Sequence, residues 1–161
     1  MTFDGKIALV TGASSGMGAA TAQMLAGRGA RVFTAQRNAA GFEDITADLA
    51  DRDAPERVIQ TVSDAAGGLD ILVNNAGIMR EGTVEESSLG DWDAQIAVNL
   101  TAPFLMTKYA MPLLKQRGGA IVNVGSIEGL GNNPRHPAYG ASKAGLHGLT
   151  RAVAVDHGLD G

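Results

Sequence analysis

Short apolar runs alternate along the chain with longer segments whose apolar residues recur at helical spacing. The run from Lys6 to Thr11 is continuously apolar from Ile7 to Val10, as in a strand buried on both faces of a sheet. Four further strands are expected over residues 31–35, 42–48 (the weaker third strand), 69–74 and 120–124. The expected helices run from the turn at 12–18 to near Gly27, from 53 to about 66, from Ser87 or Ser88 through Trp92, from Pro103 to Arg117, and from Ala138 to about His157.

This alternation of strand and helix, at about 30 residues per unit, implies right-handed crossovers between parallel strands. The pattern therefore predicts the α/β class with a doubly wound parallel sheet, the Rossmann fold. A chain of 161 residues suits one such domain over residues 1–161, because one domain takes roughly 150 residues.

The composition of the chain excludes several classes of partner and binding site. The chain has 13 basic and 17 acidic residues without a Lys/Arg cluster, so nucleic acid and anionic membranes are not expected as partners. It has no cysteine, which excludes disulfides and thiolate chemistry, and its three histidines share no ligand spacing, so we expect no metal site. Neither a signal peptide nor a membrane-spanning run is visible, and we expect a cytoplasmic protein.

The segment Thr11–Gly18 carries the first chemical signal. It joins the first strand to the first helix and has glycines at 12, 16 and 18. A dinucleotide's pyrophosphate needs backbone amides at a helix N-terminus and no side chains in its way. The alternative is an ordinary glycine-rich turn, but a strand before it and a helix after it favour cofactor binding.

The same segment resembles T-G-x-x-x-G-x-G, the pattern of classical short-chain dehydrogenases/reductases. Asn74–Gly77 matches that family's N-N-A-G, and Asn99 lies where the family places a catalytic asparagine. Tyr139 and Lys143 reproduce its Y-x-x-x-K signature, thirteen positions after Ser126. The resemblance covers essentially the whole chain and implies an NAD(P)-dependent oxidoreductase that transfers hydride between the cofactor and a secondary alcohol or ketone.

The resemblance also implies a set of site residues. The catalytic residues would be Asn99, Ser126, Tyr139 and Lys143. The cofactor would be bound by Gly12, Ser14, Ser15, Gly16, Met17, Gly18, Gln36, Arg37, Asp48, Leu49, Asn75, Ala76, Gly77, Tyr139 and Lys143.

Physical reasoning supports a part of this set. Tyr139 and Lys143 fall on one helix face, one turn apart, where an ammonium favours the phenolate form and helps proton exchange with an alcohol. Ser126 could donate to a substrate carbonyl as negative charge develops there, or simply cap a strand end or helix. Asn99 is costly in mid-helix; the family gives it a water-holding place in a proton relay, and the alternative is a satisfied buried amide.

The end of the second strand bears on cofactor choice. An acid there would bind the adenosine ribose, whereas an arginine would pair with a 2′-phosphate. Gln36 and Arg37 stand at this point, so we expect NADP(H), with NAD(H) as the alternative if Arg37 is merely solvated. A substrate would lie near four polar residues between Ser126 and Tyr139, namely Glu128, Asn132, Arg135 and His136. They either recognise a polar, hydroxylated substrate or are only surface residues of a loop.

The chain departs from the family pattern at its end, because only five strands are readable and the family normally has seven. We therefore expect a C-terminally incomplete Rossmann domain whose strand 120–124 is an unpaired edge. Whether the 161 residues turn over by themselves stays open. Alternatives to the oxidoreductase are a non-catalytic nucleotide-binding or assembly fragment, and a reductase of carrier-bound 3-oxoacyl chains. The expected partners are a small carbonyl or alcohol substrate and further copies of the chain, in a homodimer or homotetramer formed by helices 101–117 and 138–157.

Overall fold

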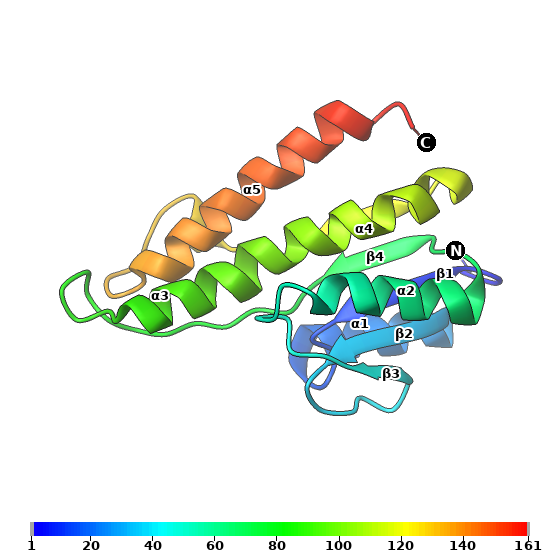
Figure 1. Ribbon diagram of the computed structural model, residues 1–161, viewed down its shortest axis with the longest axis horizontal. Coiled ribbons are helices and arrows are strands. Elements are labelled where there is room, and N and C mark those ends of the chain that lie inside the picture. The colour runs from blue at the N-terminus through cyan, green and yellow to red at the C-terminus, as the bar shows by residue number, and fades with distance from the viewer. Residues whose placement is uncertain (1, 161) are drawn as a thin grey trace.

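The computed structural model describes residues 2–160, in which a parallel sheet has the strand order β3-β2-β1-β4-β5. Strands β1 to β4 are labelled in Figure 1. Its strands are β1 (Ile7–Thr11), β2 (Arg31–Gln36), β3 (Glu43–Thr46), β4 (Ile71–Asn74) and β5 (Ala120–Asn123). The chain moves outward from β1 to β3 and then crosses back to β4 on the other side of β1. This reversal opens a crevice at the carboxyl ends of β1 and β4. The predicted doubly wound α/β fold is confirmed.

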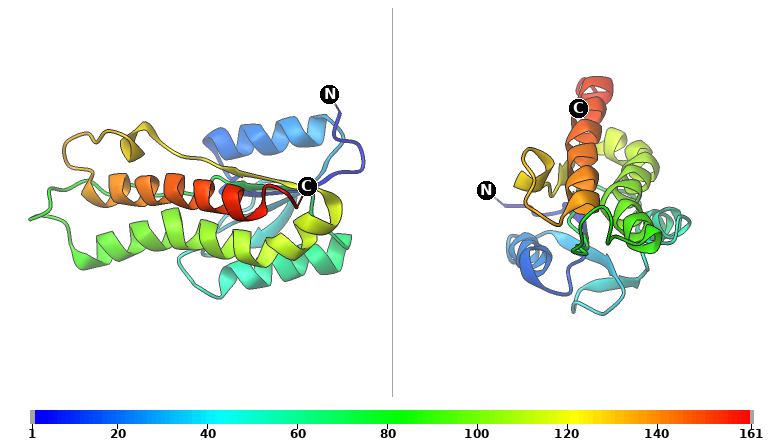
Figure 2. Two further views of the ribbon diagram at one scale, coloured as in Figure 1. Left: turned by 90° about the horizontal axis from the view of Figure 1, so that it is seen from above. Right: turned by 90° about the vertical axis from the view of Figure 1, so that its left-hand side faces the viewer.

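Helices cover both faces of the sheet. They are α1 (Gly16–Gly27), α2 (Ala54–Ala66), α3 (Leu89–Ile96), α4 (Ala102–Arg117) and α5 (Pro137–His157). The helix α1 packs on β1 and β2 on one face, whereas α2 and α4 lie together on the other, with α5 alongside the α3–α4 run (Figure 2). Within residues 2–160, none of these helices has the length and apolar character needed to cross a membrane.

The core lies on both sides of the sheet, and β1 shows how the sequence divides it. Successive side chains of a strand point to opposite faces. Leu9 joins Leu72 and Met106 on the face covered by α2 and α4, while Ala8 and Val10 join the cluster under α1. All five of these side chains are buried on faces that helices cover, which explains why the strand reads as a continuous apolar run.

The two helices expected at 87–92 and 103–117 form one continuous run, so the predicted break between them is wrong. Ser88 caps α3, its Oγ accepting from the backbone N–H of Asp91 at 3.0 Å. The helix continues to Ile96 and passes through a π-helical turn, Ala97–Thr101, into α4. Pro103 has no N–H to donate to the carbonyl of Asn99, and the wider turn accommodates the missing hydrogen bond without ending the helix.

The strand β5 pairs with β4 and forms one edge of the sheet, as predicted. Its residues are only partly covered, and Val122 is 51% exposed despite being apolar. An edge strand presents unpaired backbone groups and, here, apolar side chains.

Asp70 ties together the amino ends of three strands. Its carboxylate accepts from the backbone N–H of Ile7 and from Lys6 Nζ, both at 2.9 Å, and from Arg117 Nε at 3.0 Å. Its own carbonyl accepts from the N–H of Ala120 at 2.8 Å. Burial raises the pKa of this carboxyl, but the hydrogen bonds from Ile7, Arg117 and Lys6 outweigh it and hold the pKa below its usual value.

We expect Asp70→Asn to lower the free energy of unfolding by about 2 kcal/mol near neutral pH, because hydrogen bonds to a charged group are lost. A depressed pKa stabilises the fold above the unfolded-state pKa of about 4, and this contribution is lost as the pH falls through the lower folded-state value. Urea unfolding at about pH 7 and about pH 3 should therefore show the difference between variant and parent shrinking in acid.

Glu43→Gln is the matched control. Glu43 pairs with Arg31 at 2.7 Å, but both side chains are 45% exposed, so the loss should stay below about 1 kcal/mol. Equal losses for the two variants would contradict the role given to Asp70.

Candidate functional site

The turn after β1 packs its backbone directly on the segment that follows β4. Gly12 has a φ of +67°, and a Cβ there would lie 2.8 Å from Cα of Ala76. A Cβ on Gly18 would overlap the carbonyl oxygen of Gly12 and the side-chain amide of Asn75. Both glycines are therefore required by close approach, and a ligand reaching this turn meets backbone rather than side chains.

Thr11 and Asn75 hold the two segments together. Oγ1 of Thr11 accepts from the backbone N–H groups of Asn75 and Ala76, both at 3.0 Å. Nδ2 of Asn75 donates back to the carbonyls of Thr11 and Gly12, at 2.9 and 3.0 Å. Sequence reasoning did not assign Thr11 to the site, although a hydroxyl ending an otherwise apolar strand was a usable signal.

A cavity of about 590 Å³ opens above this turn at the carboxyl ends of β1, β2 and β4. Most of the expected cofactor residues line it: Gly12, Ser14, Ser15, Gln36, Arg37, Asp48, Leu49, Asn75, Ala76 and Gly77. Among the described residues, the lining leaves out five of that set, namely Gly16, Met17, Gly18, Tyr139 and Lys143. It adds residues that sequence reasoning missed: Ala35, Asn38, Ala47, Ala50, Ile78, Arg80, Ala94 and Val98.

Gln36 and Arg37 both line the cavity, but their side chains are placed differently. Gln36 is only 7% exposed, and its Oε1 accepts from the N–H of Ala13 at 3.2 Å. Its Nε2 donates to Thr34 at 3.0 Å and to Asp44 at 2.8 Å. The side chain of Gln36 thus fastens the turn to β2 and to the sheet edge, while Arg37 lies exposed at the cavity.

Arg80 is a second arginine among the residues that line the cavity, and its Nε lies 3.9 Å from Oδ1 of Asp91. Its backbone is clamped by Gln95, which is 2% exposed: Oε1 accepts from the N–H of Arg80 at 3.0 Å, and Nε2 donates to the carbonyl of Asp91 at 3.2 Å. A buried glutamine on a helix gave no signal in the sequence, because its partner is the backbone of a separate segment.

Tyr139 and Lys143 lie together on α5. Nζ of Lys143 is 5.8 Å from the centroid of the Tyr139 ring and donates to the carbonyl of Val124 at 2.7 Å. Lys143 is only 4% exposed, and burial lowers the pKa of its amine. The bond to Val124 places this ammonium at the end of β5, next to the segment that carries Ser126.

Ser126 begins a short 3-10 turn, Ile127–Gly129, which packs on α5. Its Oγ accepts from the N–H of Glu128 at 3.2 Å, so it does cap a turn. The capping bond uses an oxygen lone pair and leaves the hydroxyl hydrogen available to donate. The capping interpretation and the donor interpretation are therefore compatible.

Asn99 is fully buried in the π-helical turn. Its Oδ1 accepts from the N–H of Ile78 at 2.8 Å, and its Nδ2 donates to the carbonyl of Ile78 at 2.8 Å and to Oγ of Ser142 at 3.1 Å. This is the satisfied buried amide that was one of the two interpretations. It ties the segment after β4 to α5, and the water-holding role stays a prediction.

A family model described as short chain dehydrogenase matches residues 6–161. The chain belongs to this family. The predicted family membership and the predicted class, an NAD(P)-dependent oxidoreductase, are thereby confirmed.

The names of similar proteins mention different substrates. The chain is 42% identical to a D-threitol dehydrogenase of Mycolicibacterium smegmatis, over 97% of this chain and 66% of the relative. It is 37% identical to a 3-oxoacyl-[acyl-carrier-protein] reductase of Thermotoga maritima, over 97% of this chain and 70% of the relative. The structure of the aldohexose dehydrogenase of Thermoplasma acidophilum matches with a TM-score of 0.92 at 32% identity, covering 96% of this chain and 62% of that one. The chain thus spans about two thirds of the length of its relatives.

Proposed function

We propose that the protein transfers hydride between NADP(H) and a secondary alcohol or ketone that carries further hydroxyl groups. The observation that carries the proposal is the pairing of Tyr139 with Lys143, whose Nζ lies near the Tyr139 ring and binds the carbonyl of Val124 just after β5. The cavity lined by Gly12 and Gly77 opens at the ends of the neighbouring strands β1 and β4. A dinucleotide fits the cavity chemically, because Gly12, Ser14 and Ser15 line it just before α1 begins, where backbone N–H groups can bind a pyrophosphate.

The residues that would hold the cofactor follow from this lining. Gly12, Ser14 and Ser15 would bind the pyrophosphate at the start of α1, and Asp48 and Leu49 would border the adenine. When bound, the nicotinamide gives or accepts the hydride, and the protein supplies placement and the proton.

The proton chemistry belongs to α5 and the end of β5. Tyr139 would donate a proton to the substrate oxygen during reduction and remove one from the alcohol during oxidation. Lys143 would stabilise the phenolate, since its ammonium lies at the Tyr139 ring. Ser126 would donate its free hydroxyl hydrogen to the same substrate oxygen as negative charge builds up there.

The names of three similar proteins bear on the substrate. A relative named for threitol and a structural neighbour named for an aldohexose favour a small polyhydroxylated substrate. The relative named for 3-oxoacyl-[acyl-carrier-protein] favours the other candidate, a carrier-bound 3-oxoacyl chain. The two are separated by following NADPH consumption with a hydroxyketone and with a 3-oxoacyl thioester; consumption with neither would overturn the oxidoreductase proposal for this chain.

We expect Arg37→Asp to reverse the cofactor preference. The guanidinium at the cavity wall would pair with a 2′-phosphate, whereas an aspartate would repel it and bind the ribose hydroxyls. The Kd for NADPH should rise by about 10- to 100-fold, and the Kd for NADH should fall. Fluorescence titration with both cofactors measures this.

Arg151→Asp makes the same change of charge at an exposed position on α5, outside the cavity lining. It should leave the ratio of the two affinities unchanged. An unaltered ratio in Arg37→Asp would count against Arg37 as the selector.

Two further expectations from the sequence extend this proposal. We propose a cytoplasmic homodimer or homotetramer in which α4 and α5 form the contact between subunits. Phe104 on α4 and Val155 on α5, which are apolar and 48% and 84% exposed, support such a contact.

A further inference from the structure

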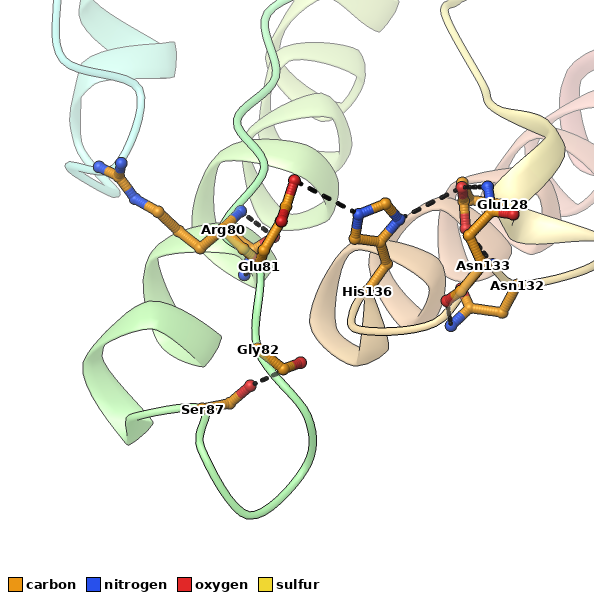
Figure 3. A network of polar contacts seen from close by, with 9 residues as sticks. Arg80, Glu81, Gly82, Ser87, Glu128, Asn132, Asn133 and His136 are labelled. Atoms are coloured by element: carbon orange, nitrogen blue, oxygen red, sulfur yellow. Dashed lines mark hydrogen bonds and ion pairs between the residues drawn. The ribbon is translucent and has the colours of Figure 1, made fainter.

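His136, the residue before α5, lies between two carboxylates from separate loops (Figure 3). Its Nδ1 is 3.3 Å from Oε1 of Glu128, in the segment after β5, and its Nε2 is 4.0 Å from Oε1 of Glu81, in the segment after β4. The rings of His136 and Tyr139 meet edge to face, with centroids 6.4 Å apart. The imidazole therefore lies beside the ring of the tyrosine proposed to carry the proton.

Glu128 fixes the hydrogen on this imidazole. Its Oε2 accepts from the backbone N–H of Asn133 at 2.8 Å, and its Oε1 also accepts from Nδ2 of Asn133. The hydrogen bond from the Asn133 backbone holds the pKa of Glu128 below its usual value, so the group stays a carboxylate that can only accept. Nδ1 of His136 must then be the donor, which leaves Nε2 of the neutral ring as an acceptor.

When the ring is neutral, Nε2 of His136 and the carboxylate of Glu81 consequently face each other as two acceptors. Their 4.0 Å separation is too long for a hydrogen bond between them. Other bonds hold the two loops at this spacing: the N–H of Gly82 donates to the carbonyl of Arg135 at 2.9 Å, and the guanidinium of Arg135 pairs with Glu86 at 2.8 Å. Two acceptors side by side favour a ligand that carries hydroxyl groups, because each hydroxyl hydrogen can be donated to either acceptor.

We propose that His136 and Glu81 recognise hydroxyl groups next to the reacting carbon, which makes them specificity-determining residues for a vicinal diol or polyol. This inference rests on the proposed function and refines its substrate class. A 3-oxoacyl thioester offers only acceptor carbonyls around its reacting carbon, so the pair would not favour it. Recognition of a hydroxyl by groups placed for it discriminates strongly against an analogue that lacks the hydroxyl.

The first test compares meso-2,3-butanediol with 2-butanol, which lacks one hydroxyl, as substrates for oxidation with NADP⁺. The parent chain should prefer the diol. His136→Phe keeps a flat ring beside Tyr139 but removes the acceptor, so kcat/KM for the diol should fall about tenfold, mainly through KM, while the value for 2-butanol changes less than about twofold. Equal losses for both alcohols would overturn the proposal, because His136 would then only support Tyr139.

His157→Phe is the control, since His157 lies at the far end of α5 and binds Asp160. It should alter neither value.

The second test does not depend on turnover. Long-range ¹H–¹⁵N spectra of the three histidines, at about pH 8 where an ordinary imidazole is neutral, report the tautomer of each ring. The His136 signals, assigned by their absence in His136→Phe, should show the Nδ1–H form. With NADPH present, the diol should shift the Nε2 signal and 2-butanol should not.

An Nε2–H tautomer, or a diol that leaves the signal unmoved while NADPH is bound, would overturn the inference. Failure of the proposed function would show separately, as no oxidation of either alcohol with NADP⁺. The tautomer in the free protein would still decide whether His136 can be the acceptor.

Discussion

Tyr139→Phe should reduce the rate of ketone reduction by about a thousandfold or more, because it removes the hydroxyl that delivers the proton. The substitution keeps the aromatic ring that lies against Lys143 and His136, so the local packing should be preserved. Among residues 2–160, the hydroxyl is not part of the cavity wall, and the Kd for NADPH should change by less than about threefold. Steady-state NADPH consumption and a fluorescence titration measure the two quantities on the same preparation.

Tyr109→Phe provides the matched control, since Tyr109 is the other tyrosine of the chain. It lies on α4 and packs against the core face covered by α2 and α4. Removing its hydroxyl should leave the rate within about twofold of the parent. If Tyr139→Phe behaved in the same way, another group would have to carry the proton, and the role proposed for α5 would fall.

The parts of the site that the sequence predicted are those set by local geometry. A strand, a glycine turn and a helix in succession define where backbone amides gather, and the cavity does open above Gly12. A spacing of four residues on a helix likewise puts Tyr139 and Lys143 on one face, and their side chains lie together. Both inferences needed only the neighbouring residues.

The parts that the sequence missed depend on partners distant along the chain. Gln36 stands at the position used to infer cofactor preference, yet its amide is buried against Ala13, Thr34 and Asp44. For Asn99, a satisfied buried amide was one of the two interpretations, but its partner, the backbone of Ile78, was not indicated. No periodicity or local spacing reports such bonds, because the residues come together only when the sheet and α5 assemble.

The predicted break between α3 and α4 is wrong for a different reason. The sequence favours a helix start at Pro103 because proline is favoured in a first turn. The alternative, a π-helical turn that absorbs the missing hydrogen bond, has the same local sequence. It is selected here by tertiary contacts, since this turn packs on α5 and holds Asn99 in place.

The second large effect is expected for Gly18→Ala, which should abolish measurable NADPH binding and lower the free energy of unfolding by about 2 kcal/mol. The added methyl group would overlap the carbonyl oxygen of Gly12 and the amide of Asn75. Asn75 cannot retreat without breaking its bonds to Thr11 and Gly12, so the backbone of the turn must move. That movement would displace the amides at the start of α1 on which the pyrophosphate depends.

Gly27→Ala separates this effect from a general cost of changing a helical glycine. Gly27 ends the same helix, and a Cβ there would meet nothing within 4 Å. Alanine is the better helix former, so this variant should be as stable as the parent or more stable, with an unchanged Kd for NADPH. Urea unfolding and NADPH titration of both variants decide the matter. If Gly18→Ala bound NADPH like Gly27→Ala, the glycine turn would not be the cofactor site, since a cradle that tolerates a methyl group at its tightest contact does not depend on bare backbone.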